Sequence, residues 1–167
     1  MPTPPRTRLS LILPVIRQRL IDWLQFPAER VLLTITDEPP FDAQAEQYVW
    51  VRLRRQAPGT PYVEGGGRTD ARVRRTLAVT VRTRQALDTP LEHLLWLLTA
   101  HLDAEHAVYD ALLDFYPAGA DGMNLTTEPL HPGTAAEPRA DRDDPTWGES
   151  TVEFEIVYEM DLDQSFV

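Results

Sequence analysis

The side chains of this sequence that are best suited to chemistry are its 16 arginines, nine of which lie between Arg52 and Arg84. A guanidinium group binds phosphates and carboxylates with paired hydrogen bonds. Together with Tyr48 and Trp50, this stretch could bind single-stranded nucleic acid through phosphate contacts and base stacking. The net charge of −10 opposes such a ligand at long range. We therefore favour a protein partner.

The charges are divided unequally along the chain. Residues 1–87 contain 14 Arg and 8 acidic residues, a net charge of +6, whereas residues 88–167 contain 2 Arg and 18 acidic residues, a net charge of −16. Each copy of such a chain offers both signs, so copies can bind one another head to tail. This division points to assembly rather than to catalysis.

Sequence motifs typical of enzymes do not occur. The glycine run that begins at Gly65 lacks the Gly-Lys-Ser/Thr ending of a phosphate-binding loop, and a predicted strand follows it. His101 and His106 are five residues apart, which does not place two zinc ligands on one helical face. There is no Cys, no serine in a nucleophile elbow, and the Asp143-Asp144 pair lies in a Pro-bracketed loop. We expect no enzyme, and no catalytic, metal-binding or cofactor-binding residue.

Hydrophobic periodicity predicts the elements that position the charges. Ser10 is the expected N-cap of the first helix, Pro27 follows its end, and Asp103 is the expected cap that separates two central helices. The predicted elements are a helix over 11–24, strands over 31–36, 47–55 and 71–84, helices over 88–102 and 103–115, a short strand over 124–129, a polar loop over 131–147 and a strand over 149–161.

This order favours an α+β fold in a single domain that spans residues 1–167. We expect a mixed, mainly antiparallel sheet of four or five strands, with the N-terminal helix and the central helix pair packed on one face. In the first central helix the expected buried stripe consists of Leu91, Leu94, Leu95, Leu98 and Leu102.

The other face of the predicted sheet carries an arginine ladder on one strand and an acidic ladder on the last strand. If these strands are neighbours, cross-strand ion pairs of about 0.2–1 kcal/mol each follow. If they are not, the ladders can bind a partner of opposite charge. The candidate residues for a subunit interface or a ring lumen are Arg52, Arg54, Arg72, Arg74, Arg82, Arg84, Glu153, Glu155 and Glu159. The candidate residues of partner-contact loops are Gly65, Gly66, Gly67, Arg68, Arg139 and Arg142.

The layout resembles the phage tail terminator family, whose members are also described as tail completion or minor tail proteins. The elements that carry the resemblance are the helix over 11–24, the strands over 49–55 and 75–82, the helical block over 91–113, residues 125–130 and the strand over 152–158. The resemblance implies a homo-oligomeric ring, commonly a hexamer, that caps the tail tube, stops its polymerisation and offers a head-joining surface. DNA would pass through the ring as cargo.

The implied partners are further copies of the chain, a tail tube protein and a head completion or connector protein. No stretch reaches the roughly 18 apolar residues of a membrane span, so no membrane is expected as a partner. The expected location is the cytoplasm during synthesis and the tail of a phage or prophage virion after assembly. The alternatives are a head–tail connector, a cap protein of a contractile injection system, or an unrelated non-catalytic interaction domain.

Overall fold

The computed structural model describes residues 8–34, 46–54, 63–64, 70–140 and 147–161. Its elements are α1 (Arg8–Leu24), the short 3₁₀-helix η1 (Ala28–Arg30), β1 (Val31–Leu33), β2 (Gln47–Leu53), β3 (Val63–Glu64), β4 (Asp70–Arg84), α2 (Leu91–Leu112), β5 (His131–Ala140) and β6 (Trp147–Asp161).

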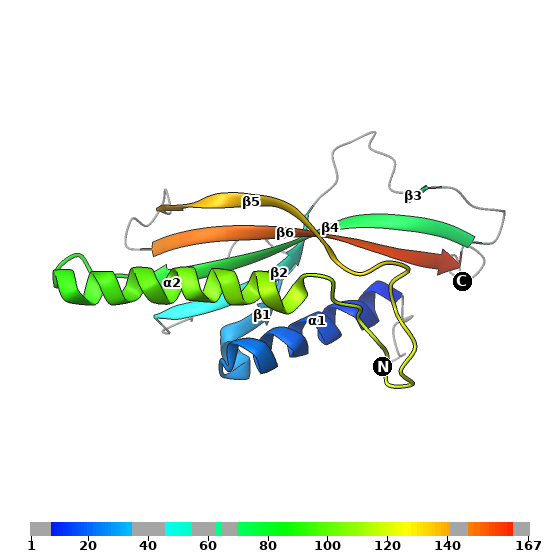
Figure 1. Ribbon diagram of the computed structural model, residues 1–167, viewed down its shortest axis with the longest axis horizontal. Coiled ribbons are helices and arrows are strands. Elements are labelled where there is room, and N and C mark those ends of the chain that lie inside the picture. Colours follow the sequence, from blue (N-terminus) through cyan, green and yellow to red (C-terminus); the bar gives the residue numbers. More distant parts are fainter. Residues whose placement is uncertain (1–7, 35–45, 55–62, 65–69, 141–146, 162–167) are drawn as a thin grey trace, which may run out of the picture.

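The strands form one sheet in the order β1-β2-β4-β6-β5, and the two-residue β3 pairs with β4. β1 runs parallel to β2, whereas the other pairs are antiparallel. Both helices lie on the same side of the sheet, below it in Figure 1. This arrangement confirms the predicted α+β fold with a mixed, mainly antiparallel sheet.

The centre of the sheet is the pairing of β4 with β6. The two 15-residue strands are in register along their whole length, from Asp70 opposite Asp161 to Arg84 opposite Trp147. Alternation along both strands places most of the apolar side chains toward the helices and most of the charged ones on the opposite side. The core between sheet and helices consists of Ile12, Ile16, Leu20, Val31, Val49, Val51, Val73, Leu77, Val79, Val81, Ala104, Val108, Ala111, Leu112, Leu130, Val152, Phe154, Ile156 and Tyr158.

The first helix begins earlier than predicted. Ser10 lies inside α1 rather than at its N-cap, and Pro14 is also within the helix. The buried side of α1 is narrow: Ile12, Ile16 and Leu20 are buried, while Leu11 and Trp23 are exposed.

The predicted central helix pair is a single helix. α2 continues from Leu91 to Leu112 without a break, so the expectation that Asp103 caps a second helix was wrong. Asp103 is exposed within α2, so its carboxylate is in contact with water. The surrounding Ala and Leu residues favour helix, which allows the helix to continue through an N-cap residue type.

The buried stripe predicted for the first half of α2, from Leu91 to Leu102, was also wrong. The helix buries Leu97, His101, Ala104, Val108 and Ala111 together with Leu112. Of the leucines expected in the core, Leu94 is half-buried, and the other four are exposed. Alanine and valine let the helix approach the sheet closely, whereas the larger leucines project away from it.

The segment after α2 differs from the prediction as well. Residues 124–129 form no strand beyond an isolated bridge between Ala118 and Asn124. The predicted loop contains β5, which pairs with β6 at the edge of the sheet. Pro132 and Pro138 obscured this strand in the sequence, but an edge strand tolerates proline and bulges, and the β5–β6 register shifts twice.

Two substitutions test the orientation of α2. Leu112→Ala removes a fully buried side chain, so we expect a loss of about 2–5 kcal/mol in the free energy of unfolding. Leu98→Ala, in the same helix but 54% exposed, should change that free energy by about 0.5 kcal/mol or less. Urea unfolding of dilute protein measures both. Equal losses for the two variants would contradict the observed orientation.

Candidate interaction surface

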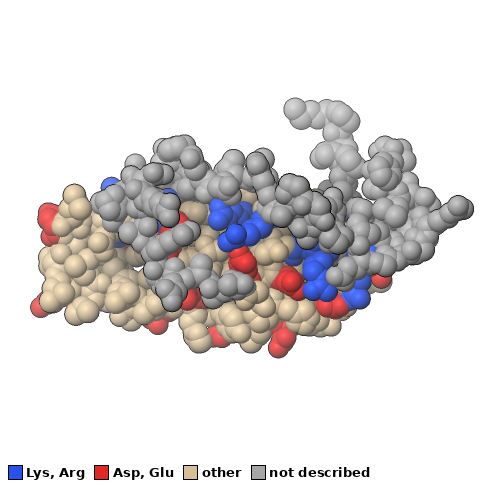
Figure 2. All heavy atoms as spheres, turned by 90° about the horizontal axis from the view of Figure 1, so that it is seen from above, with Lys and Arg blue, Asp and Glu red and all other residues tan. Residues whose placement is uncertain are grey.

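The candidate surface is the outer face of the sheet, which we define as the side of β2, β4 and β6 that points away from the helices. Figure 2 views the molecule from this side, and arginine and acidic atoms lie intermingled on its visible part. The arginine ladder of β4 and the acidic ladder of β6 are neighbours, because the two strands pair directly. Arg72 lies opposite Glu159, and Arg82 lies opposite Glu149. Both signs of charge share one face of one molecule.

Small residues at the middle of β4 allow charges to meet across it. On the outer face β4 carries Thr76, Ala78 and Thr80, with Ala78 lying between Arg52 of β2 and Glu153 of β6. Arg54 reaches across this low region and forms an ion pair with Glu153. A long side chain at position 78 would separate those two charges.

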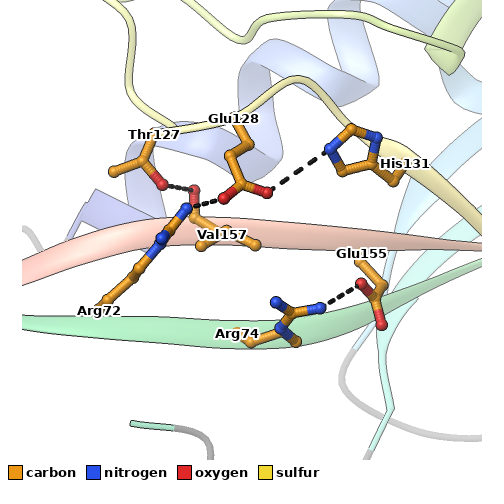
Figure 3. Close-up of polar contacts among 7 residues, drawn as sticks. All are labelled: Arg72, Arg74, Thr127, Glu128, His131, Glu155 and Val157. Atoms are coloured by element: carbon orange, nitrogen blue, oxygen red, sulfur yellow. Dashed lines mark hydrogen bonds and ion pairs between the residues drawn. The ribbon is translucent and has the colours of Figure 1, made fainter. Parts of the chain in front are cut away.

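Two further ion pairs involve arginines of the first half of β4 (Figure 3). Arg74 donates a hydrogen bond from Nη1 to Oε2 of Glu155 at 2.7 Å. Arg72 pairs with Glu128, which comes from the segment that precedes β5. His131 lies on the other side of the same carboxylate, with its Nε2 3.5 Å from Oε2 of Glu128.

Glu128 is a site residue that sequence reasoning missed. Its segment is held beside β6 because Thr127 donates to the carbonyl oxygen of Val157 from both its backbone N–H and its hydroxyl. The position of Glu128 depends on this tertiary contact, and the Glu-Pro-Leu sequence carries no signal for it. The three arginines of these ion pairs are between 41% and 51% exposed, so each pair contributes about 1 kcal/mol or less.

An aromatic cluster occupies the other end of the outer face. Tyr48, Trp50 and Trp147 are buried there against one another. Arg82 is 6% exposed, and its guanidinium lies 4.8 Å from the Trp147 ring centre and 5.8 Å from that of Trp50. Arg84 lies over Trp147 at 5.5 Å. These two predicted interface arginines thus make cation–π contacts within the chain.

The remaining predicted site residues lie as follows. Arg52 is half-buried on β2, and Glu159 is exposed on β6. Arg139 is on β5, opposite Glu149, so its predicted place in a loop was wrong for the reason given for β5. Gly65, Gly66, Gly67, Arg68 and Arg142 lie outside the described residues. A role of the outer face in contacts between copies stays a prediction.

A buried polar network joins α2 to the sheet near the aromatic cluster. His101 is 5% exposed, with Nδ1 2.8 Å from the Thr83 hydroxyl and Nε2 3.0 Å from the Ser150 hydroxyl. The Gln47 amide donates to that Thr83 hydroxyl and to the carbonyl of Ala100. One assignment satisfies these groups: Thr83 donates to Nδ1, and Nε2–H donates to Ser150. Four elements are thereby joined through one neutral imidazole.

The surroundings of His101 disfavour its charged form. Burial lowers the pKa of His101 below its ordinary value of 6.5, and the nearby Glu105 carboxylate opposes this effect in part. The other three imidazoles are exposed, each within 4 Å of a carboxylate: His93 with Glu46, His106 with Asp110, and His131 with Glu128. His101 is therefore a structural histidine of the core.

Comparisons with known proteins give a likeness of fold. No protein-family model matches the sequence, and no curated protein is significantly similar to it. The structure is similar to a chain of the virion of a native gene transfer agent (GTA) particle, with a TM-score of 0.53 and 17% identity over 91% of this chain and 97% of that chain. A second solved chain has a TM-score of 0.47 at 17% identity, covering 90% of this chain and 94% of its own length.

In the described part of the chain, neither helix combines the length and the apolar character that crossing a membrane requires.

The His101 network predicts a pH-dependent stability. The unfolded chain takes up the imidazole proton at a higher pH than the folded chain, so the free energy of unfolding should fall as the pH drops below about 6.5. His101→Gln should remove this component and cost about 1–3 kcal/mol at neutral pH, because Thr83 and Ser150 lose a partner. Urea unfolding between pH 7.5 and 5 measures the effect.

His106→Gln is the matched control, because His106 is exposed on the same helix. It should leave the pH dependence of unfolding close to that of the unaltered chain. An identical pH dependence in the His101→Gln variant and the unaltered chain would contradict the assignment.

Substitutions at the Arg74–Glu155 pair test whether the charged ladders form ion pairs within one chain or between copies. Arg74→Glu should lower the free energy of unfolding by about 1 kcal/mol, because two carboxylates then face each other. The swapped variant, Arg74→Glu with Glu155→Arg, should recover part of that loss. Arg8→Glu serves as the control for stability, since it makes the same change of charge at an exposed position of α1, away from the sheet. Unchanged unfolding with a reduced particle mass for Arg74→Glu would instead place the charge between copies.

Proposed function

We propose that this protein is a structural component of a phage-like virion, and that it acts as a tail terminator. In this role copies form a ring, a hexamer in the form we propose, that caps the tail tube, ends its polymerisation and provides the surface to which the head connector binds. DNA passes through the ring as cargo. The chain is synthesised in the cytoplasm and ends in the virion tail of a phage or prophage.

The observation that carries the proposal is the likeness to the GTA virion chain. The aligned regions cover nearly the whole of both chains, so the likeness extends across the single domain that we propose. The likeness supports a place in a virion, and the element order that resembles tail terminators in the sequence supports the more specific role of a terminator.

The distribution of charge supports self-association. The first 87 residues carry a net charge of +6 and the remainder −16. A heterologous contact, in which one surface meets a different surface on the next copy, generates a closed ring when the rotation closes. Opposite charges on the two surfaces favour that head-to-tail orientation over random contacts.

The proposal assigns no catalytic role to the chain. Two of the buried polar side chains have structural roles: His101 joins α2 to the sheet, and Arg82 lies in the aromatic cluster. The tail tube protein and the head completion protein are the proposed partners beside further copies.

Removal of the gene from the phage or prophage genome that encodes it tests the function. We expect particles with tails of irregular, extended length and heads that are not joined to tails, seen by electron microscopy of negatively stained lysates. Expression of the intact chain from a plasmid should restore tails of uniform length.

The outcome separates the terminator from its alternatives. Tails of normal length without heads would favour a head–tail connector. Particles of normal length, joined to heads and fully active, would contradict both roles.

A further inference from the structure

The N-terminal half of α2 presents an apolar surface that this chain leaves uncovered. Leu91, Leu95, Leu98 and Leu102, here called the leucine stripe, have exposures of 72%, 57%, 54% and 47%. Their spacing of four, three and four residues places them on one face of the helix. Leu87, just before the helix, is 88% exposed.

α2 therefore has two apolar faces. One contains Ala104, Val108 and Ala111 and packs against the sheet and α1, and the other is the leucine stripe. A helix that is apolar on opposite sides is characteristic of a buried environment. The stripe and Leu87 together expose a few hundred Å² of apolar surface, which is comparable with the largest apolar patches of monomeric proteins, and such patches are often functional.

The charges around the stripe indicate the nature of its partner. α2 contains Glu92, Asp103, Glu105 and Asp110 and no Lys or Arg. Packing two stripes together would bring acidic side chains against acidic side chains, which disfavours a symmetric contact. At the end of the molecule where α2 begins, on the left of Figures 1 and 2, much of the visible surface is uncharged, with acidic atoms along its margin. The complementary surface is apolar with a positive rim.

The first part of the same chain offers a surface of that kind. Residues 8–34, which form α1, η1 and β1, contain four Arg and two acidic residues. They leave Leu11, Trp23 and Leu33 between 38% and 46% exposed. The Arg19 guanidinium lies 4.3 Å from the Trp23 ring centre, so a basic and an apolar side chain adjoin on α1, whereas the leucines of α2 lie on a helix with acidic side chains and no Lys or Arg.

We propose that the leucine stripe of one copy packs against the α1–β1 side of a second copy in a head-to-tail contact. The inference rests on the proposed function for the self-association of the chain, and it adds the surface through which the copies meet. A heterologous contact of this type leaves one free stripe at the end of any open oligomer, so further copies add until the ring closes.

The first experiment measures the mass of the purified full-length chain by light scattering over a wide range of concentration. We expect the unaltered chain to form particles larger than its 19.0 kDa monomer. Leu95→Gln with Leu98→Gln should raise the dissociation constant by at least about a hundredfold. Glutamine favours helix nearly as well as leucine, so circular dichroism and the unfolding midpoint at low concentration should stay unchanged.

Met123→Gln is the matched control, because Met123 is 70% exposed and lies outside α2. This variant should keep the particle mass of the unaltered chain. A stripe variant that also keeps that mass would overturn the inference and leave the proposed function standing.

A mixing experiment tests the head-to-tail arrangement. A copy with the altered stripe retains its α1–β1 side, and a copy with Leu11→Gln and Trp23→Gln retains its stripe. Each variant alone should be monomeric, while an equimolar mixture should contain a 1:1 dimer, because one intact contact can form. A mixture without dimer, although the unaltered chain associates, would overturn the head-to-tail contact.

Other occupants of the stripe are distinguishable. If the unaltered chain is monomeric at every concentration, and the stripe variant is absent from the tails that form, the stripe binds another tail protein. That result would overturn the second copy as occupant. Extended tails after gene removal would still support the proposed function in that case.

Discussion

The pairing of β4 with β6 is the constraint on which the rest of the structure depends. The strands match residue by residue over 15 positions, so alternation assigns each side chain to one face of the sheet for the whole length of the molecule. A slip by one residue would move Phe154 and Ile156 out of the core and turn the glutamates of β6 toward the helices. Because the helices bury the apolar face, this register is strongly favoured, and the arrangement of charge on the outer face follows from hydrophobic packing on the inner one.

The outer face combines charges that the chain itself brings together. Small side chains in the middle of β4 let Arg54 meet Glu153 across the strand, and Arg72 and Arg74 find carboxylates beside β6. At the other end Arg82 is enclosed by Trp50 and Trp147. The large difference in charge between the two halves of the sequence is therefore reduced locally, because part of it is neutralised where the first half and the second half lie side by side. What remains for contact between copies is the excess of acid, much of it on α2, and the basic residues of α1 and η1.

The sequence allowed the strands of the central sheet to be predicted but not the buried face of the first half of α2. Much of β2, β4 and β6 alternates between apolar and polar residues with period two. This pattern is a local property of the sequence, so it can be recognised without knowledge of the tertiary structure. α2 has apolar residues on two faces, and hydrophobicity alone ranks the leucines above the alanines as core residues. The sheet selects the opposite face because Ala104, Val108 and Ala111 permit close approach, which depends on a partner surface that the sequence does not display. β5 and the role of Glu128 were not predicted for a related reason. The positions of both depend on contacts with β6 and not on a local sequence pattern.

The same reasoning explains why the leucines are where they are. Four leucines at helical spacing are unfavourable on the surface of a monomer, since each leaves apolar area in water. Internal packing does not require them, because the small residues of α2 already fill its contact with the sheet. Their placement is understandable if the surface is covered in the assembled state, and the acidic side chains beside them then give the contact a direction. In this view α2 belongs to two cores, one within the chain through its alanines and one between copies through its leucines, so the fold of the subunit and its assembly depend on opposite faces of one helix.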